Sequence, residues 1–199
     1  MININDVEIN GLTAICNVPA EHNILNSIYN DKFKKETNTI YISLSRTNKY
    51  DKGKPYLDDI MYHSMMDSNT FHKNLLIDLP EVYLTVEEQI QMANKLVQII
   101  HRNINVVITV NSIQLIKHLN ILHMINPDPD KDEETRKKLC KIFVPKEQLI
   151  PADKYNLYEY INTENKKIFV EKREVTKYDT GINAFDKIIN MQKDIESKI

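Results

Sequence analysis

The amino-acid sequence predicts an α/β fold: a mostly parallel sheet flanked by helices, with a C-terminal antiparallel hairpin and a terminal helix. Three observations predict it. Strand-like and helix-like segments alternate from residue 74 to residue 122, which favours parallel strands joined by helices. The run 75–78 is apolar until its last residue, as in strands that are covered on both faces. Two β-prone runs near the C-terminus are joined by a short polar turn, as in a hairpin.

The N-terminal part supplies a strand–loop–helix unit. Gly11 permits a tight turn between two β-prone runs, and Pro19 lies in an irregular segment before the first helical pattern, in which Ile24, Leu25 and Ile28 share one face. The elements expected here are a strand over 2–9, a strand over 12–16, a loop over 17–23, the start of a helix over 24–29, a strand over 39–44 and a short helix over 57–66.

The middle of the chain carries the clearest helix signal. Thr85 and Glu88 have the spacing of a capping box, in which the Thr hydroxyl caps the helix and the Glu side chain reaches back. Apolar residues then recur at alternating spacings of four and three, which predicts one apolar face on a helix of about 16 residues. That face comprises Val86, Ile90, Ala93, Val97 and Ile100. A strand over 105–109 and a helix over 113–121 complete the alternation.

The C-terminal part begins with a charged, turn-rich segment, 126–138, which we expect to be an exposed loop. The β-prone runs 155–161 and 167–175, joined by polar residues, predict the antiparallel hairpin. Gly181 precedes the last amphipathic helix. The apolar residues of that helix are Phe185, Ile188, Ile189 and Ile195.

Composition excludes several classes of protein. Hydrophobic residues make up 42% of the 199 residues, enough for a core. The net charge of -2 gives no general attraction to nucleic acid, so we expect none to be bound directly. No apolar run approaches the roughly 20 residues that span a bilayer, and the N-terminus has no secretion-signal pattern. The two cysteines, Cys16 and Cys140, indicate no disulfide framework. We therefore expect a cytoplasmic protein that does not associate with a membrane.

Glycine is scarce in this chain. The three glycines are Gly11, Gly53 and Gly181. A loop that cradles phosphate needs glycine where the backbone approaches the phosphates closely. Neither GxxxxGK[ST] nor GxGxxG occurs in the sequence. The sequence therefore lacks the ordinary means of holding a nucleotide.

An ATPase-like pattern nevertheless begins at the strand 74–78. This strand ends in Asp78, where nucleotide-hydrolysing ATPases place an acid that binds Mg²⁺, and most of them follow it with a second acid that positions the attacking water. Here the next residue is Leu79. The chain continues as Leu79-Pro80-Glu81-Val82-Tyr83-Leu84-Thr85-Val86-Glu87-Glu88-Gln89.

This stretch resembles the Walker B region of ABC-type ATPases, in the AAA-domain branch related to the overcoming-lysogenisation-defect and SMC-like ATPases. In that branch the strand is followed by EPExxLHPxxQ. The matching residues are Asp78, Pro80, Glu81, Leu84 and Gln89. Leu79 stands in place of the catalytic Glu, and Thr85-Val86 stands in place of the His-Pro pair.

Two further segments resemble the same family. Its next strand ends in TTHS, with a His that senses the γ-phosphate; here Asn111 replaces that His and cannot relay a proton. The family's GLTVIxGxNGxGKSxLLNAI resembles residues 11–28. In an ungapped alignment Glu21 replaces the phosphate-binding Lys, and His22 replaces the Mg²⁺-binding Ser. A carboxylate about 4 Å from a phosphate costs roughly 4 kcal/mol at an effective dielectric constant near 20.

The resemblance covers nearly the whole chain and implies a P-loop-NTPase-like sheet within a single ATPase-like domain, 1–199. Its parts would be a degenerate nucleotide-binding core (1–125), the charged loop (126–138) and the C-terminal hairpin and helix (139–199). The stretch between the strand at 39–44 and Leu75 is too short for the family's helical insertion, and it lacks a convincing LSGGQ-like signature.

The resemblance also assigns site residues. The vestigial catalytic positions are Asp78, Leu79 and Asn111, and the vestigial nucleotide loop comprises Asn17, Glu21, His22 and Asn23, with Glu81 and Ser112 beside it. Asp78 would bind Mg²⁺ only together with a nucleotide. Plain structural roles are the alternative: Asp78 caps a strand end, Glu81 makes a surface or packing contact, and Asn111 and Ser112 cap a helix.

We therefore expect a catalytically inactive ATPase-like protein, a pseudo-ATPase, that acts through protein–protein interaction with a protein partner or as a homo-oligomer and needs no cofactor. The resemblance suggests bacterial or phage defence or counter-defence as the setting. Two alternatives stay open: a residual ATP-binding or slow ATPase subunit that uses ATP and Mg²⁺ with a partner's help, and a nucleic-acid-binding accessory protein.

Overall fold

The computed structural model describes residues 2–19, 22–36, 38–43, 73–82, 84–124, 149–151, 153–164, 167–175 and 181–196. Its elements are β1 (Ile2–Asn3), η1 (Ile4–Asp6), β2 (Leu12–Cys16), α1 (Ile24–Ile28), η2 (Tyr29–Phe33), β3 (Thr39–Ser43), β4 (Asn74–Asp78), α3 (Val86–Ile100), β5 (Asn105–Val110), α4 (Ile113–Met124), β6 (Tyr155–Glu164), β7 (Lys167–Arg173) and α6 (Asn183–Glu196). The predictions for Leu44, 57–66 and 126–138, and the position of Glu21, lie outside the described residues.

The described strands form one seven-stranded sheet in the order β1-β7-β6-β2-β5-β4-β3. The five strands from β6 to β3 are parallel to their neighbours, whereas β7 runs antiparallel to β6 and β1 antiparallel to β7. The predicted α/β class, mostly parallel sheet and C-terminal hairpin are therefore confirmed. The sequence did not predict that the hairpin joins the central sheet, with β6 parallel to β2.

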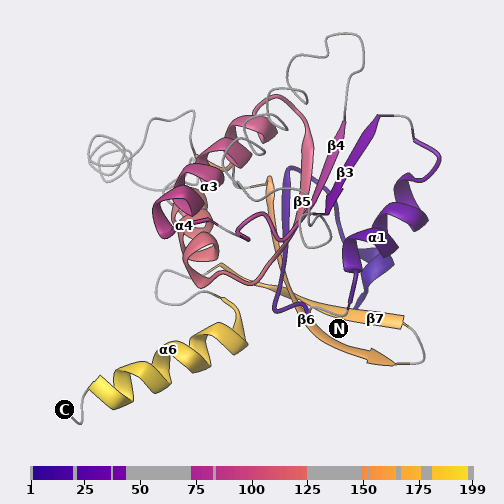
Figure 1. The fold of residues 1–199 in the computed structure, drawn as a ribbon. Coiled ribbons are helices and arrows are strands. Elements are labelled where there is room, and N and C mark those ends of the chain that lie inside the picture. The colour runs from indigo at the N-terminus through magenta and orange to yellow at the C-terminus, as the bar shows by residue number, and fades with distance from the viewer. Residues whose placement is uncertain are drawn as a thin grey trace.

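Helices cover both faces of the sheet, as Figure 1 shows. On one face, alternate residues of β2, β4 and β5 pack with α3 and α4; Leu12, Leu75 and Val106 belong to this core. On the other face, Ile15, Leu76 and Val107 pack with Ile24, Leu25 and Ile28 of α1. Because successive side chains of a strand point to opposite faces, these largely apolar strands supply both cores at once.

The N-terminus departs from the prediction. Instead of one strand over 2–9, the chain forms the two-residue strand β1 and then the 3₁₀ turn η1, whose Asn3 side chain accepts a hydrogen bond from the Asn5 N–H. Short polar side chains that bond nearby backbone groups favour turns over strands. The turn buries Ile4, and Gly11 then enters β2 with φ +66°, its α-carbon facing the Lys154 backbone.

Helix α3 confirms the predicted capping box: the Thr85 hydroxyl accepts the Glu88 N–H, and the Glu88 carboxylate accepts the Thr85 N–H. The predicted apolar face is wrong at its start, because Val86 is 55% exposed and Ile90 is 37% exposed. The first turn of α3 is exposed, and burial begins later along the helix. The buried residues are Met92, Ala93, Leu96, Val97, Ile99 and Ile100.

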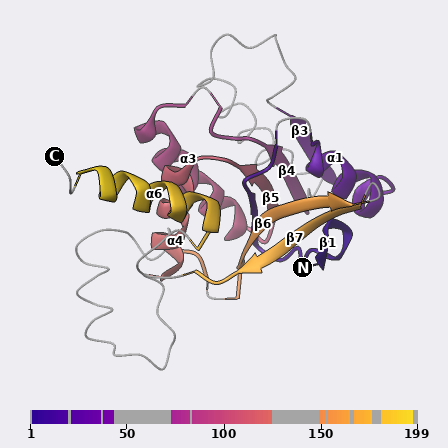
Figure 2. The same ribbon diagram turned by 90° about the horizontal axis from the view of Figure 1, so that it is seen from below.

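Helix α6 packs against the core at its start and is exposed farther along. Ile182 and Phe185, at its start, pack into the core, but Ile188 is 47% exposed and Met191 is 57% exposed. The helix leads away from the sheet, most clearly in Figure 1, and its C-terminal end projects beyond the other labelled elements (Figures 1 and 2). In the described part of the chain, no helix combines the length and the apolar character needed to cross a membrane.

Candidate functional site at the carboxyl edge of the sheet

The strand order brings the predicted site residues to one place. Strands β4, β5 and β2 are parallel neighbours, so Asp78, Thr109 and Ile15 stand side by side near the edge at which these strands end, here called the carboxyl edge. The loop after β2 leads to α1 on one face, whereas the loops after β4 and β5 lead to α3 and α4 on the other. In open α/β sheets, ligands bind where connections from neighbouring strands diverge in this way.

Asp78 is 8% exposed and is held by its neighbour in β5. The Thr109 hydroxyl donates to the Asp78 carboxylate, and the same hydroxyl oxygen accepts the Leu79 N–H at 3.1 Å. Leu79 has φ +51°, a left-handed conformation that a branched aliphatic residue adopts only at a cost. The position that the resemblance gives to a catalytic acid therefore carries an aliphatic side chain on strained backbone.

Glu81 lies in the turn after β4, and its carboxylate reaches the start of the next connection. Its Oε1 atom accepts the Asn111 N–H at 2.6 Å, while its Oε2 atom is buried without a hydrogen bond. Burial raises the pKa of the Glu81 carboxyl, and nearby Asp78 raises it further; the backbone N–H groups of Asn111, Glu81 and Ser112 act in the opposite direction. Ionisation of the Glu81 carboxyl is therefore less favourable in the folded protein than in water.

Asn111 is attached to the loop after β2. Its Oδ1 atom accepts the Val18 N–H at 3.0 Å, and its Nδ2 group donates to the Val18 carbonyl at 3.0 Å. The side-chain amide thus pairs with both polar groups of one residue. Asn17, just before, has φ +58°, which an Asn tolerates better than most residues. The Asn111 amide, at the position that the resemblance gives to a sensor His, therefore has its oxygen and its NH₂ group hydrogen-bonded to Val18.

Ser112 begins α4. Its hydroxyl accepts the Leu115 N–H at 3.3 Å and donates to the Gln89 side chain of α3 at 2.5 Å. Gln89 in turn donates to the Leu84 carbonyl. The helix-capping alternative is therefore confirmed for Ser112, and Gln89 links the starts of the two helices. Asn111 does not cap the helix with its side chain, because that side chain bonds Val18.

His22 and Asn23 also have internal contacts. The His22 ring packs tilted against Tyr160, with the ring centroids 5.4 Å apart. The Asn23 side chain caps α1 by accepting the Asn26 N–H and also accepts the Tyr41 hydroxyl at 2.9 Å. Both residues therefore fasten the start of α1 to the sheet. They do not converge with Asp78 in any contact that the described residues show.

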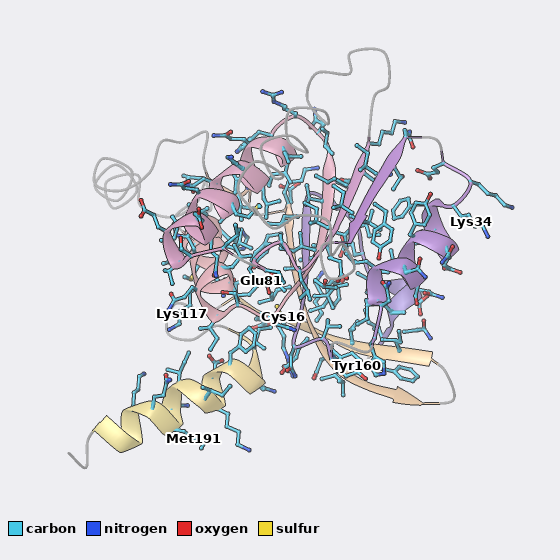
Figure 3. All side chains as sticks on the ribbon, viewed as in Figure 1. Cys16, Lys34, Glu81, Lys117, Tyr160 and Met191 are labelled. Carbon is cyan, nitrogen blue, oxygen red and sulfur yellow. The ribbon has the colours of Figure 1, made fainter. Side chains whose placement is uncertain are left out.

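A second buried acid at this edge was missed from the sequence. Glu159 of β6 pairs in register with Cys16 of β2 and is 4% exposed. Its carboxylate binds Arg173 of β7 at 2.7 Å and accepts the Asn183 N–H at the start of α6. Burial raises the pKa of the Cys16 thiol, with Glu81 and Glu159 adding to the rise, so this thiol stays protonated and inert. Figure 3 shows Glu81 and Cys16 together at the carboxyl edge.

The described residues contain no group of three or more His, Cys, Asp or Glu side chains that could hold a metal ion. The two acids at the end of β4 and in the turn after it have hydrogen-bonding partners in Thr109 and the Asn111 backbone. We compared the chain with protein-family models, with curated proteins and with solved structures, and nothing matched.

Proposed function

We propose that this protein is a pseudo-ATPase: an ATPase-like domain that does not hydrolyse nucleotide and acts through protein–protein interaction. The observation that carries the proposal is the internal bonding at the carboxyl edge. Asp78 is bound by Thr109, Asn111 by Val18, and Glu81 by the Asn111 backbone. The resemblance expects a Mg²⁺ ligand at Asp78, a phosphate sensor at Asn111 and the Glu of the Pro-Glu pair at Glu81, and each of these residues has a partner within the chain.

The chemistry of the replaced residues supports the same proposal. Hydrolysis needs a group that orients the attacking water and positive groups that stabilise the charge on the transferred phosphoryl group. Leu79 offers no polar atom in its side chain, and Asn111 cannot relay a proton. The carboxylates of Asp78 and Glu81 add negative charge to an edge where a nucleotide would bring more.

Exposed apolar side chains on α6 support the interaction role. Ile188 and Met191 lie on a helix that leads away from the sheet, and Figure 3 places Met191 well away from the core. Large apolar side chains gathered on an exposed element are typical of surfaces that contact other proteins. We propose that the chain binds a protein partner or a second copy of itself, in the defence or counter-defence setting that the resemblance suggests.

Titration calorimetry with ATP and Mg²⁺ tests the loss of the nucleotide site. We expect no binding heat for the unaltered protein and none for the Asp78→Ala variant. Binding at micromolar concentration that Asp78→Ala abolishes would instead favour the residual ATP-binding subunit. Leu79→Glu should show no phosphate release, since restoring one acid leaves Asp78, Asn111 and the loop after β2 as they are.

The interaction role has its own test. Size-exclusion chromatography with light scattering gives the mass of the purified protein, and co-purification with proteins encoded beside it in its genome examines specific partners. We expect either a mass above that of one chain or a complex of fixed stoichiometry with such a neighbour. A strictly monomeric protein that retains none of them would contradict the proposal, whatever the calorimetry shows.

A further inference from the structure

A cavity of about 400 Å³ lies between the N-terminal turn η1 and the segment η2 that continues α1. The turn η1 contacts both α1 and β7, and Figure 1 shows α1 just above β7 on this side of the molecule. Sites for small ligands in proteins have volumes of about 300 to 1,000 Å³. The polar lining residues are Asn3, Asn5, Ser27, Asn30 and Asp31, and the apolar ones are Ile4 and Ile168. None of them belongs to the carboxyl edge, so the cavity is separate from the site described above.

The two walls of the cavity are held in place by internal contacts. In η1, the Asn3 side chain accepts the Asn5 N–H at 3.0 Å, and Ile4 is buried. The partly buried Lys32 of η2 donates from its Nζ atom to the carbonyl of Val7, which ends η1, at 2.7 Å. The segment η2 is a π-helical turn, a rare conformation that occurs frequently at functional sites. The cavity is therefore formed before any ligand binds.

One wall of the cavity is rich in hydrogen-bond acceptors. Ser27, Asn30 and Asp31 are three and four residues apart, which places them on one side of their helix. The Ser27 hydroxyl donates to the Asn23 carbonyl at 3.5 Å, so its oxygen remains as an acceptor. The Asn30 Nδ2 group donates to the Asn26 carbonyl at 2.8 Å, and its Oδ1 atom accepts no hydrogen bond from another described residue. The exposed Asp31 carboxylate likewise has no hydrogen bond or ion pair within the described part of the chain.

The charge of the cavity favours a cation. Asp31 is the one charged residue among the described lining residues. The Lys32 ammonium is already bonded to the Val7 carbonyl. Burial lowers the pKa of Lys32, while Asp6 and Asp31 both raise it, so two carboxylates lie near one ammonium. An anionic ligand such as a phosphate would be repelled by this surplus of negative charge.

A guanidinium group on an aliphatic stem matches these features. It carries five N–H donors and no acceptor, in a planar fork that pairs with a carboxylate through two hydrogen bonds. It is more weakly hydrated than an ammonium, so its transfer into a cavity costs less free energy. The apolar surfaces of Ile4 and Ile168 suit its methylene stem. The side-chain amide of Asn5, which has no hydrogen bond to another described residue, offers a further acceptor oxygen.

We propose that this cavity binds a guanidinium group on an aliphatic stem, as in arginine, with Asp31 as its ion-pair partner and Ser27 and Asn30 as further acceptors. The group belongs to a small molecule such as free arginine or to an Arg residue of a protein, and its chemistry is the same in both. The site does not depend on the proposed function, because none of its residues belongs to the degenerate nucleotide site.

Titration of the full chain, followed by NMR at single residues, tests this site. N-acetyl-L-arginine amide carries the guanidinium and no other charge. It should shift the backbone signals of Asn30 and Asp31 with a dissociation constant of about 1 mM or lower. N-acetyl-L-citrulline amide has nearly the same shape with a neutral urea in place of the guanidinium, and it should bind at least about fivefold more weakly.

A pair of variants checks the role of Asp31. Asp31→Asn keeps the shape of the side chain and removes its charge, so it should weaken binding of the arginine derivative about fivefold. Asp6→Asn is the matched control, because Asp6 is also exposed and also acts on Lys32 but does not line the cavity. Its loss should change the affinity less than about twofold. Both acids are exposed, so both variants should keep the fold.

Free L-arginine and a short peptide with one internal Arg identify the source of the guanidinium. If free arginine binds more tightly than the blocked derivative, the ligand is a small molecule; if the peptide does, the ligand is a protein. Three results would overturn the proposal: no shift at Asn30 and Asp31 with the arginine derivative, equal affinity for the citrulline derivative, or equal weakening in Asp31→Asn and Asp6→Asn. Calorimetry with ATP bears on the proposed function alone, so failure of one proposal is distinguishable from failure of the other.

Discussion

The two ends of the same parallel strands are held by different chemistry. At the amino edge, where β3, β4 and β5 begin, side-chain amides form a row of hydrogen bonds: Asn105 accepts the Gly11 N–H and donates to Asn74, and Asn74 donates to the Glu36 carboxylate and the Thr39 hydroxyl. At the carboxyl edge, the carboxylates of Asp78 and Glu159 are buried, and Leu79 has a left-handed backbone.

This difference distinguishes polar groups that stabilise the fold at little cost from buried acids that lower its stability. A row of satisfied amides fixes strand register at little cost, since each buried group has a partner. Buried acids beside a left-handed Leu79 cost stability, and proteins tolerate such costs mainly at functional positions. Buried carboxylates therefore distinguish the carboxyl edge from the amino edge, and for this reason it is the candidate site.

The largest effect is expected at the amino edge, from Gly11→Ala. An added methyl group would lie 2.4 Å from the Lys154 carbonyl oxygen, and φ is +66° at this position. Overpacking against backbone together with left-handed strain should lower the free energy of unfolding by about 3 kcal/mol. Urea denaturation measures it, and a loss below about 1 kcal/mol would show that the β2 start yields easily.

Asn105→Ala should break the amide row. It leaves the Gly11 N–H and the side-chain Oδ1 atom of Asn74 without their Asn105 partner. This loss should lower the free energy of unfolding by about 2 kcal/mol in the same assay. Asn30→Ala is the matched control, because the exposed Asn30 side chain bonds only within its own helical turn; it should change stability by less than about 0.5 kcal/mol. Equal losses of unfolding free energy in the two variants would show that the hydrogen bonds of Asn105 stabilise the protein no more than an exposed side-chain hydrogen bond does.

Glu81 should make the protein less stable as pH rises, which is opposite to the usual effect of a carboxylate with a lowered pKa. Burial raises the pKa of this carboxyl above its ordinary 4.5 in the folded state, so its contribution to stability is complete below that value and is lost as pH rises through the folded pKa. Relative to Glu81→Gln, the unaltered protein should therefore lose unfolding free energy as pH rises from about 4.5 towards neutrality. Chemical denaturation at several pH values measures this difference; a flat or opposite trend would refute the assignment of Glu81 as a destabilised charge.

The smallest effect concerns Leu79. Asn tolerates the left-handed region better than Leu, so Leu79→Asn should raise the free energy of unfolding by about 0.5 kcal/mol. The reverse exchange, Asn17→Leu at φ +58° at the exposed residue that follows β2, should lower it by a similar amount. Thermal melting of both variants measures these two changes in stability. A loss of stability in Leu79→Asn would mean that packing of the Leu side chain outweighs the backbone strain.

Local patterns predicted the elements well. The alternation of segments from 74 to 122 gave β4, α3, β5 and α4, and the Thr85–Glu88 capping box set the start of α3 to the residue, because both signals act within one or two turns. Asn3 and Asn5 were misjudged: their side chains favour a turn, and the apolar residues around them suggested a longer strand.

The site was predicted only in outline. Asp78, Asn111 and Ser112 follow parallel strands, so their arrival at one edge could be foreseen. Their partners could not, because the contact from Asn111 to Val18 spans 93 positions in the sequence and depends on which strands are neighbours. The same holds for Glu159, whose burial and pairing with Arg173 follow from β6 lying beside β2. No local pattern marks that Glu as buried.

Helix α6 is attached to the body of the protein through contacts at its start. Its first N–H is held by Glu159, which Arg173 fixes from the neighbouring strand, while Ile188 and Met191 farther along are exposed. A partner that binds the outer part of this helix would therefore contact a segment whose first N–H is hydrogen-bonded to Glu159. Glu159 pairs in register with Cys16 of β2, so a partner bound to the exposed part of α6 would be connected to the carboxyl edge through this one carboxylate.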